Sequence, residues 1–131
     1  MRLPYAASRR YTPAAMDPHF DGVIFQTHPA ELARRIRSPR PPFLIVDVRS
    51  AAQRARGIIT GAVAMRSTDL EALPGAADAK TEFFVVGHDL ADGEVRRTTN
   101  RLRELGAHRV VELTGGMFEW EHFGLPTSKA A

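Results

Sequence analysis

The 131-residue sequence predicts a single α/β domain with a mostly parallel central sheet of about five strands, flanked by helices on both faces. Short runs rich in aromatic and β-branched residues alternate along the chain with amphipathic, helix-like segments. The clearest runs lie at 43–49 (FLIVDVR) and 83–86 (FFVV). They are apolar enough for strands that are covered on both faces, as in a parallel sheet.

The segment from residue 23 to residue 73 is predicted to hold three strands and three short helices. Pro29 suits the first position of a helix, and Glu31 adds a favourable charge in its first turn. His28 is expected to cap this helix or to lie at the surface, and Ser50 suits the N-cap of the next one. In order, we expect a strand at 23–25, a helix opened by 27–31 and ended by 38–42, a strand at 43–49, a helical turn at 50–56, a strand at 62–65 and a helix at 67–73.

The second half is organised around a strand, a polar loop and a helix between residues 82 and 106. The strand at 83–86 leads into the loop at 87–93, and Gly106 follows the helix at the position that most often ends one. A strand at 109–113, a glycine loop at 114–116 and a helix at 117–123 follow. Phe118 and Trp120 do not share one face of that helix, so one is expected to cover the sheet and the other to lie near the loop.

Residues 1–21 are predicted to form a flexible N-terminal extension, residues 22–127 the domain, and residues 128–131 a C-terminal tail. The extension has prolines at 4, 13 and 18 and no sustained hydrophobic period. Met16 could be the true start of translation. A second interpretation of the extension is a docking arm that uses its tyrosine and arginine side chains, namely Tyr5, Arg9, Arg10 and Tyr11.

Composition narrows the possible functions. The chain contains no cysteine, which excludes a disulfide, a thiolate nucleophile, a persulfide and a cysteine-ligated zinc site. Net charge is +3, but no aromatic residues are interleaved with basic ones as in base-stacking proteins, so nucleic acid is not an expected partner. No apolar run is long enough to cross a membrane, and no secretory signal is recognisable, so a cytoplasmic location is expected.

The candidate ligand-binding site is the loop after the strand at 83–86, because ligands of open α/β sheets lie at the carboxyl ends of strands, against helix N-termini. Asp47 and Arg49 end a neighbouring buried strand and need partners. They either form an internal ion pair that holds the following loop or face a ligand. The loop residues are His88, Asp89, Leu90, Ala91, Asp92, Gly93 and Glu94, and the supporting residues are Asp47, Arg49, Gly115, Gly116 and Trp120.

In order and spacing, these motifs resemble the rhodanese-homology domain, a family of sulfurtransferases and related phosphatases. The resemblance covers residues 23–127, and its motifs are Asp47-Val48-Arg49, 57–62 (GIITGA), the loop and helix at 87–106, Thr114-Gly115-Gly116, Trp120 and Gly124-Leu125-Pro126. In active members, the loop begins with a nucleophilic cysteine, and its backbone amides hold the anionic substrate. Here Asp89 or His88 takes the cysteine position, and neither can carry a persulfide.

The resemblance therefore implies a catalytically inactive binding or regulatory module, with an unknown protein partner or a small anion as its ligand and without a cofactor. Three carboxylates in the loop, those of Asp89, Asp92 and Glu94, are expected to oppose anion binding, although Asp92 could instead cap the helix. The main alternative is a divergent enzyme that uses His88 and Asp89 in place of the cysteine. A metal site is not expected. It would need His88 and Asp89 to meet a distant histidine such as His28 or His122, and no local ligand motif supports that.

Overall fold

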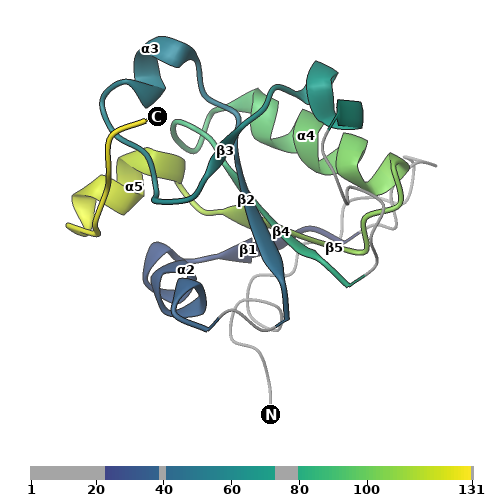
Figure 1. The fold of residues 1–131 in the computed structure, drawn as a ribbon, viewed down its shortest axis with the longest axis horizontal. Coiled ribbons are helices and arrows are strands. Elements are labelled where there is room, and N and C mark those ends of the chain that lie inside the picture. The colour runs from purple at the N-terminus through teal and green to yellow at the C-terminus, as the bar shows by residue number, and fades with distance from the viewer. Residues whose placement is uncertain (1–22, 39–40, 73–79, 131) are drawn as a thin grey trace.

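The described part of the chain forms one sheet of five strands in the order β1-β5-β4-β2-β3, and every strand pair is parallel (Figure 1). The protein was analysed as a computed structural model, which describes residues 23–38, 41–72 and 80–130. The predicted α/β fold with a parallel sheet is confirmed. The strands are β1 (Phe25–Thr27), β2 (Phe43–Asp47), β3 (Val63–Ala64), β4 (Glu82–Val86) and β5 (Arg109–Leu113).

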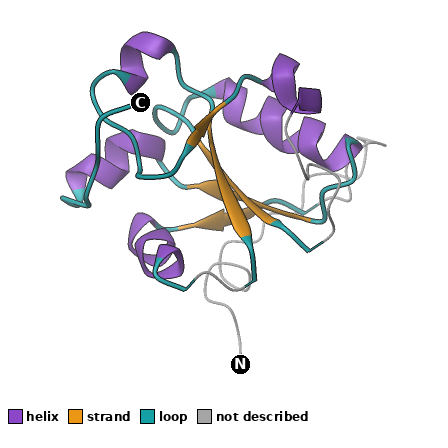
Figure 2. Cartoon of the chain, viewed as in Figure 1, coloured by secondary structure: helices purple, strands orange, loops and turns teal. Residues whose placement is uncertain are grey.

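Helices cover both faces of this sheet, as predicted (Figure 2). One face packs against α4 and the 3₁₀ helix η1, which contribute Leu102 and Leu70, and the other packs against α2 and α5, which contribute Leu32 and Trp120. The helices are α2 (Pro29–Ile36), α3 (Ala51–Arg54), η1 (Ser67–Ala72), α4 (Gly93–Glu104) and α5 (Gly116–His122). None of the described helices is long and apolar enough to cross a membrane.

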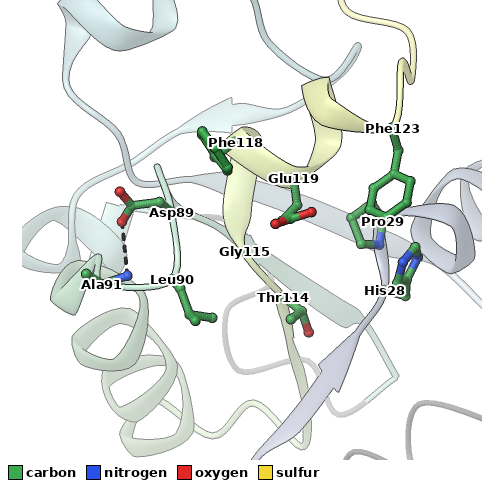
Figure 3. Close-up of a pocket in the computed structure, with 10 residues that line it drawn as sticks. All are labelled: His28, Pro29, Asp89, Leu90, Ala91, Thr114, Gly115, Phe118, Glu119 and Phe123. Carbon is green, nitrogen blue, oxygen red and sulfur yellow. Dashed lines mark hydrogen bonds between the residues drawn. The ribbon is translucent and has the colours of Figure 1, made fainter.

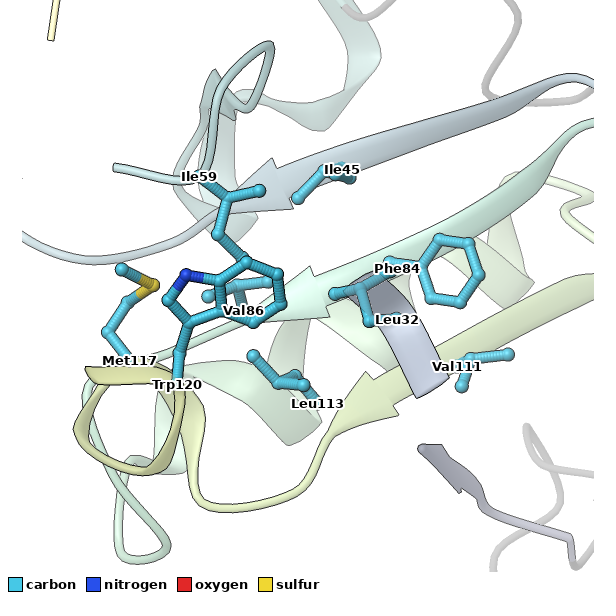
Figure 4. Close-up of a cluster of buried hydrophobic side chains, with 9 residues drawn as sticks. All are labelled: Leu32, Ile45, Ile59, Phe84, Val86, Val111, Leu113, Met117 and Trp120. Carbon is cyan, nitrogen blue, oxygen red and sulfur yellow. The ribbon is translucent and has the colours of Figure 1, made fainter. Parts of the chain in front are cut away.

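Alternation along the strands builds two separate layers of the core. In β4, Phe83 and Val85 face α4, whereas Phe84 and Val86 face α5. Both faces are apolar because both are covered, which explains the continuous apolar run in the sequence. Figure 4 shows the second layer, in which Trp120 of α5 belongs to one cluster with aliphatic side chains from β2, β4, β5 and α2.

Local capping explains where several helices begin. The His28 Nδ1 atom accepts a hydrogen bond from the Ala30 backbone N–H at 3.0 Å, so His28 is the cap of α2 that the sequence suggested. Ser50 and Gln53 form a reciprocal capping box at the start of α3. Asp92 caps α4 by accepting a hydrogen bond from the Glu94 N–H at 3.0 Å.

The structure differs from the sequence-based prediction at some element ends. The first strand is Phe25–Thr27 rather than 23–25, because its pairing with Val111–Leu113 of β5 sets its register. The predicted N-terminal extension, including Met16, lies outside the described residues. At the other end, Ser128 was assigned to the tail, but it forms an antiparallel bridge with Ile58.

Candidate functional site

The candidate site lies where the loop between β4 and α4 meets the start of α5. The backbone oxygens of Gly87 and His88 accept hydrogen bonds from the N–H groups of Met117 and Phe118, both at 2.9 Å. The first turn of α5 therefore lies directly against the loop. A side chain on Gly116 would not fit there, because an added Cβ would lie 2.4 Å from the Gly87 oxygen.

The carboxylate of Asp92 accepts hydrogen bonds from backbone N–H groups at both ends of the loop. Its Oδ2 accepts a hydrogen bond from the His88 N–H at 2.9 Å, while its Oδ1 accepts the helix-capping bond from the Glu94 N–H. One carboxylate thus joins His88 to the first turn of α4. It also packs against Gly87, where an added Cβ would lie 2.8 Å from Oδ2. The N–H groups of His88 and Glu94 therefore already donate to a negative charge.

His88 and Asp89, the two candidates for the cysteine position, are both roughly half exposed in this loop. The His88 Nε2 and Asp89 Oδ2 atoms are 3.9 Å apart, which is too long for a hydrogen bond. Instead, the Asp89 Oδ1 atom accepts a hydrogen bond from the Ala91 N–H at 3.0 Å, closing a local turn. This geometry is not that of a nucleophile held by its base.

Glu94 lines a hollow beside the loop together with Asp89 and Asp92, and its carboxylate is held there by partners outside the loop. Its Oε2 accepts hydrogen bonds from the Ser67 N–H at 3.1 Å and the Ser67 hydroxyl at 3.0 Å. Its Oε1 accepts one from the Arg97 Nε at 2.8 Å, and the Arg66 Nε lies 3.4 Å from Oε2. Glu94 therefore links α4 to η1, and Arg97 pairs with it.

The same contacts set the ionisation of Glu94. Burial alone would raise its pKa, but hydrogen bonds from Ser67 and Arg97 and the nearby charge of Arg66 together lower the pKa from 4.5 to about 2. The ionised carboxylate is therefore favoured in the folded state. Because the folded pKa is the lower one, this contribution to stability is present above about pH 4.5 and is lost as pH falls toward 2.

Replacing Glu94 with glutamine is expected to lower the free energy of unfolding by about 1–3 kcal/mol at pH 7, because hydrogen bonds to a charged group are lost. Urea denaturation at a series of pH values measures the difference from wild type, which should shrink between pH 4.5 and 2. Glu104→Gln, at an exposed position of the same helix, is the control. A Glu94→Gln effect that does not change with pH would contradict the assignment.

Asp47 and Arg49 form a buried ion pair at the end of β2. Arg49 donates to both Asp47 carboxylate oxygens, from Nη2 at 2.8 Å and from Nε at 3.1 Å. The same guanidinium donates to the backbone oxygens of Gln53 at 3.2 Å and Gly57 at 2.8 Å. The ion-pair alternative is therefore the arrangement found, and it holds the chain from β2 through α3 in place.

A second guanidinium near the loop is also engaged. Arg96 donates to both carboxylate oxygens of Glu112, at 2.8 and 3.1 Å, and Thr99 adds a hydrogen bond at 2.7 Å. This contact fastens α4 to β5. Arg96 also lines a hollow of about 250 Å³ together with the loop residues Asp89 and Asp92, so this ion pair lies beside the loop.

Beside the loop lies a largely apolar pocket of about 450 Å³ that sequence reasoning missed (Figure 3). We call it the Phe118 pocket. Its ten lining residues come from three distant segments, 28–29, 89–91 and 114–123. The one sequence signal for this pocket was the prediction that Phe118 and Trp120 lie on different faces of the last helix. In the structure, Trp120 is buried in the core and Phe118 is 60% exposed at the pocket. The residues that line the pocket are His28, Pro29, Asp89, Leu90, Ala91, Thr114, Gly115, Phe118, Glu119 and Phe123.

A smaller hollow of about 320 Å³ lies beside the loop. Three carboxylates line it, those of Asp89, Asp92 and Glu94, together with Arg49, Arg66 and His88 among others. Its two arginines are paired with carboxylates, Arg49 with Asp47 and Arg66 with Glu94. It therefore offers an anion little uncompensated positive charge. In the described part of the chain, no three histidine, aspartate or glutamate side chains converge as a metal site would require.

The fold and the loop together define a class: an α/β domain with a candidate ligand loop between a central parallel strand and the helix that follows it. The sequence model of the rhodanese-like domain family matches residues 28–123. The chain belongs to this family, and it is a member without the active-site cysteine.

Solved structures support the same assignment. The Alr3790 protein from an Anabaena species is 30% identical, with a TM-score of 0.67 over 79% of this chain and 82% of that one. The BH2092 protein from Bacillus halodurans is 21% identical, with a TM-score of 0.70 over 79% and 76%. A thiosulfate sulfurtransferase from Pseudomonas aeruginosa shares the fold at 21% identity and a TM-score of 0.67 over 80% of this chain and 19% of that one. No curated protein matches the sequence.

Proposed function

We propose that this protein is a non-catalytic rhodanese-like domain that acts as a binding or regulatory module. The chain has no cysteine to carry sulfur or attack a phosphate. The observation that carries the proposal is the carboxylate of Asp92, which takes hydrogen bonds from the His88 and Glu94 N–H groups. The loop that would cradle an anionic substrate holds a negative charge of its own.

The size of the repulsion supports this function. Two like charges about 4 Å apart near a protein surface repel by about 4 kcal/mol. A millimolar affinity corresponds to about 4 kcal/mol of binding free energy, so the repulsion is large enough to cancel weak anion binding. An anion at the loop would face Asp89, Asp92 and Glu94, while the nearby Arg49, Arg66 and Arg96 are already paired.

An NMR titration of the backbone amides of residues 88–94 with thiosulfate and phosphate tests the proposal. We expect no saturable shifts in the wild type at millimolar anion. Asp92→Ser keeps a capping oxygen for α4 but removes the charge and shortens the side chain, so it should gain saturable shifts confined to this loop. Asp69→Ser, at an exposed position of η1, is the matched control and should show no saturable shifts on titration with the anions.

The same samples are assayed for transfer of sulfur from thiosulfate to cyanide, and no turnover is expected. Turnover that persists in both His88→Ala and Asp89→Asn would contradict the proposal, as would saturable loop shifts in the wild type. Turnover or hydrolysis lost in Asp89→Asn would instead favour the alternative enzyme that uses His88 and Asp89. Activity and anion binding are thus measured separately.

A further inference from the structure

We propose that the Phe118 pocket is the docking site for a linear segment of a protein partner that presents a bulky apolar side chain next to a lysine or arginine. The inference rests on the proposed role as a binding module and assigns that role to one surface. It places binding beside the former substrate loop rather than inside it. The pocket and the loop share Asp89, Leu90 and Ala91, so a bound partner would also contact the loop.

The first support is the distribution of exposed apolar side chains. In the described residues, the exposed large hydrophobic side chains are Leu90, Phe118 and Phe123, which are 79%, 60% and 50% exposed. All three line this one pocket, although they come from two different segments. Single exposed hydrophobic residues are ordinary, whereas a group around one concave site is typical of an interaction surface. The pocket volume also lies in the range common for binding sites.

The second support is the charge of the pocket. Asp89 and Glu119 contribute two carboxylates, and none of the ten lining residues is a lysine or arginine. Figure 3 shows the Glu119 side chain between Phe118 and Pro29. Its carboxylate makes no ion pair or side-chain hydrogen bond with the described residues. A partner with a cationic group beside its apolar anchor complements both features, whereas an acidic segment would be repelled.

The third support is that the pocket walls are held in place before any partner binds. Gly115 adopts a left-handed conformation with φ 74°, and the Glu119 side chain packs over it so closely that an added Cβ would lie 2.1 Å from its Cγ. The Phe118 N–H donates to the His88 oxygen, and the His28 ring meets the edge of Phe123 with centroids 4.7 Å apart. Rigid walls reduce the entropy lost on binding.

Selection of random twelve-residue peptides displayed on phage against the full chain provides the test. We expect enriched sequences to carry a large apolar residue adjacent to arginine or lysine. Synthetic peptides of these sequences are then titrated into labelled protein, and shifts are expected at residues 89–91 and 114–123. The absence of any enriched peptide, or enrichment of acidic sequences, would overturn the proposal.

Variants of the pocket separate its apolar and charged contributions. Phe118→Ser should weaken the selected peptides at least about tenfold, as for a central contact of an interface. Glu119→Gln should weaken them about fivefold, and only at low salt, because one exposed charge pair is lost. Glu121→Gln, exposed on the same helix but outside the pocket, is the control and should bind as the wild type does. Equal effects of the two glutamine variants would count against the site.

Two outcomes distinguish other occupants and the proposed function itself. The first 21 residues include Tyr5, Arg9, Arg10 and Tyr11, so a synthetic peptide of that segment is titrated as well. If this peptide binds the pocket of the wild-type protein but not that of Phe118→Ser, the occupant of the pocket is the chain's own N-terminal segment and not an external partner. Sulfur transfer by the wild-type protein would reject the non-catalytic role, whatever the result with the peptides. If the protein shows no sulfur transfer and no anion binding, and the selection also yields no peptide, only the docking surface is rejected.

Discussion

Replacing Arg49 with methionine is expected to lower the free energy of unfolding by about 3–5 kcal/mol, because it leaves the charge of Asp47 buried and unpaired. The side chains of Arg49 and Asp47 are only 3% and 1% exposed. The variant also removes the donors to the backbone oxygens of Gln53 and Gly57, which hold the segment after β2. Urea denaturation at neutral pH measures the change.

Surface and compensated variants provide the controls for this effect. Arg34→Met removes the partner of Glu31 on the surface of α2, where the Arg34 side chain is 65% exposed, and should cost less than about 1 kcal/mol. In the double variant Asp47→Leu/Arg49→Met, no buried charge remains, so part of the loss should be recovered. If Arg49→Met costs no more than Arg34→Met, the ion pair does not stabilise the fold.

Gly116→Ala is expected to destabilise the protein by about 3 kcal/mol or more, since two separate costs add. Gly116 has φ 58°, a left-handed conformation that costs other residues about 1–2 kcal/mol. Its added Cβ would also lie 2.4 Å from the Gly87 oxygen and 2.8 Å from the His88 carbonyl carbon, and overpacking of this kind costs about 1–3 kcal/mol. The clash is with backbone, so no side-chain rotation relieves it.

Gly124→Ala separates these two costs. Gly124 also has a left-handed φ, 66°, but an added Cβ there meets nothing within 4 Å. It should therefore show only the conformational cost of about 1–2 kcal/mol. Thermal unfolding compares the two variants, and NMR shifts of the loop at 87–89 should change in Gly116→Ala alone. Similar stability losses in both variants would show that α5 does not pack against the loop as described.

Much of the fold could be predicted from local signals. The apolar runs at 43–49 and 83–86 predicted buried parallel strands, and the strand at 109–113 was predicted with the bounds that the structure shows. Caps at Ser50 and Asp92 were also recognisable, because a capping side chain acts on amides only a few residues away. The predicted ends of β1 were wrong, because the register of this strand depends on its pairing with β5, more than 80 residues away in the sequence.

The sequence was less informative about the site. It placed three carboxylates at the loop, but it did not predict that Ser67, 27 residues earlier, donates hydrogen bonds to the carboxylate of Glu94. The Phe118 pocket had no sequence motif because its walls come from three segments that only the parallel sheet brings together. Glu119 and Phe123 look like ordinary residues of a short helix until α5 is placed beside α2 and the loop.

By itself, the sequence determined the α/β class, the resemblance to the rhodanese family and the exclusion of cysteine chemistry, because each follows from local pattern or composition. Only the tertiary structure decided where the charges go. It directs one carboxylate, that of Asp92, to the loop amides, Glu94 to η1 and Asp47 to Arg49. The physical reason is that a buried or half-buried carboxylate accepts hydrogen bonds from the donors that lie within about 3 Å of it. Long-range packing, and not spacing in the sequence, determines which donors lie there.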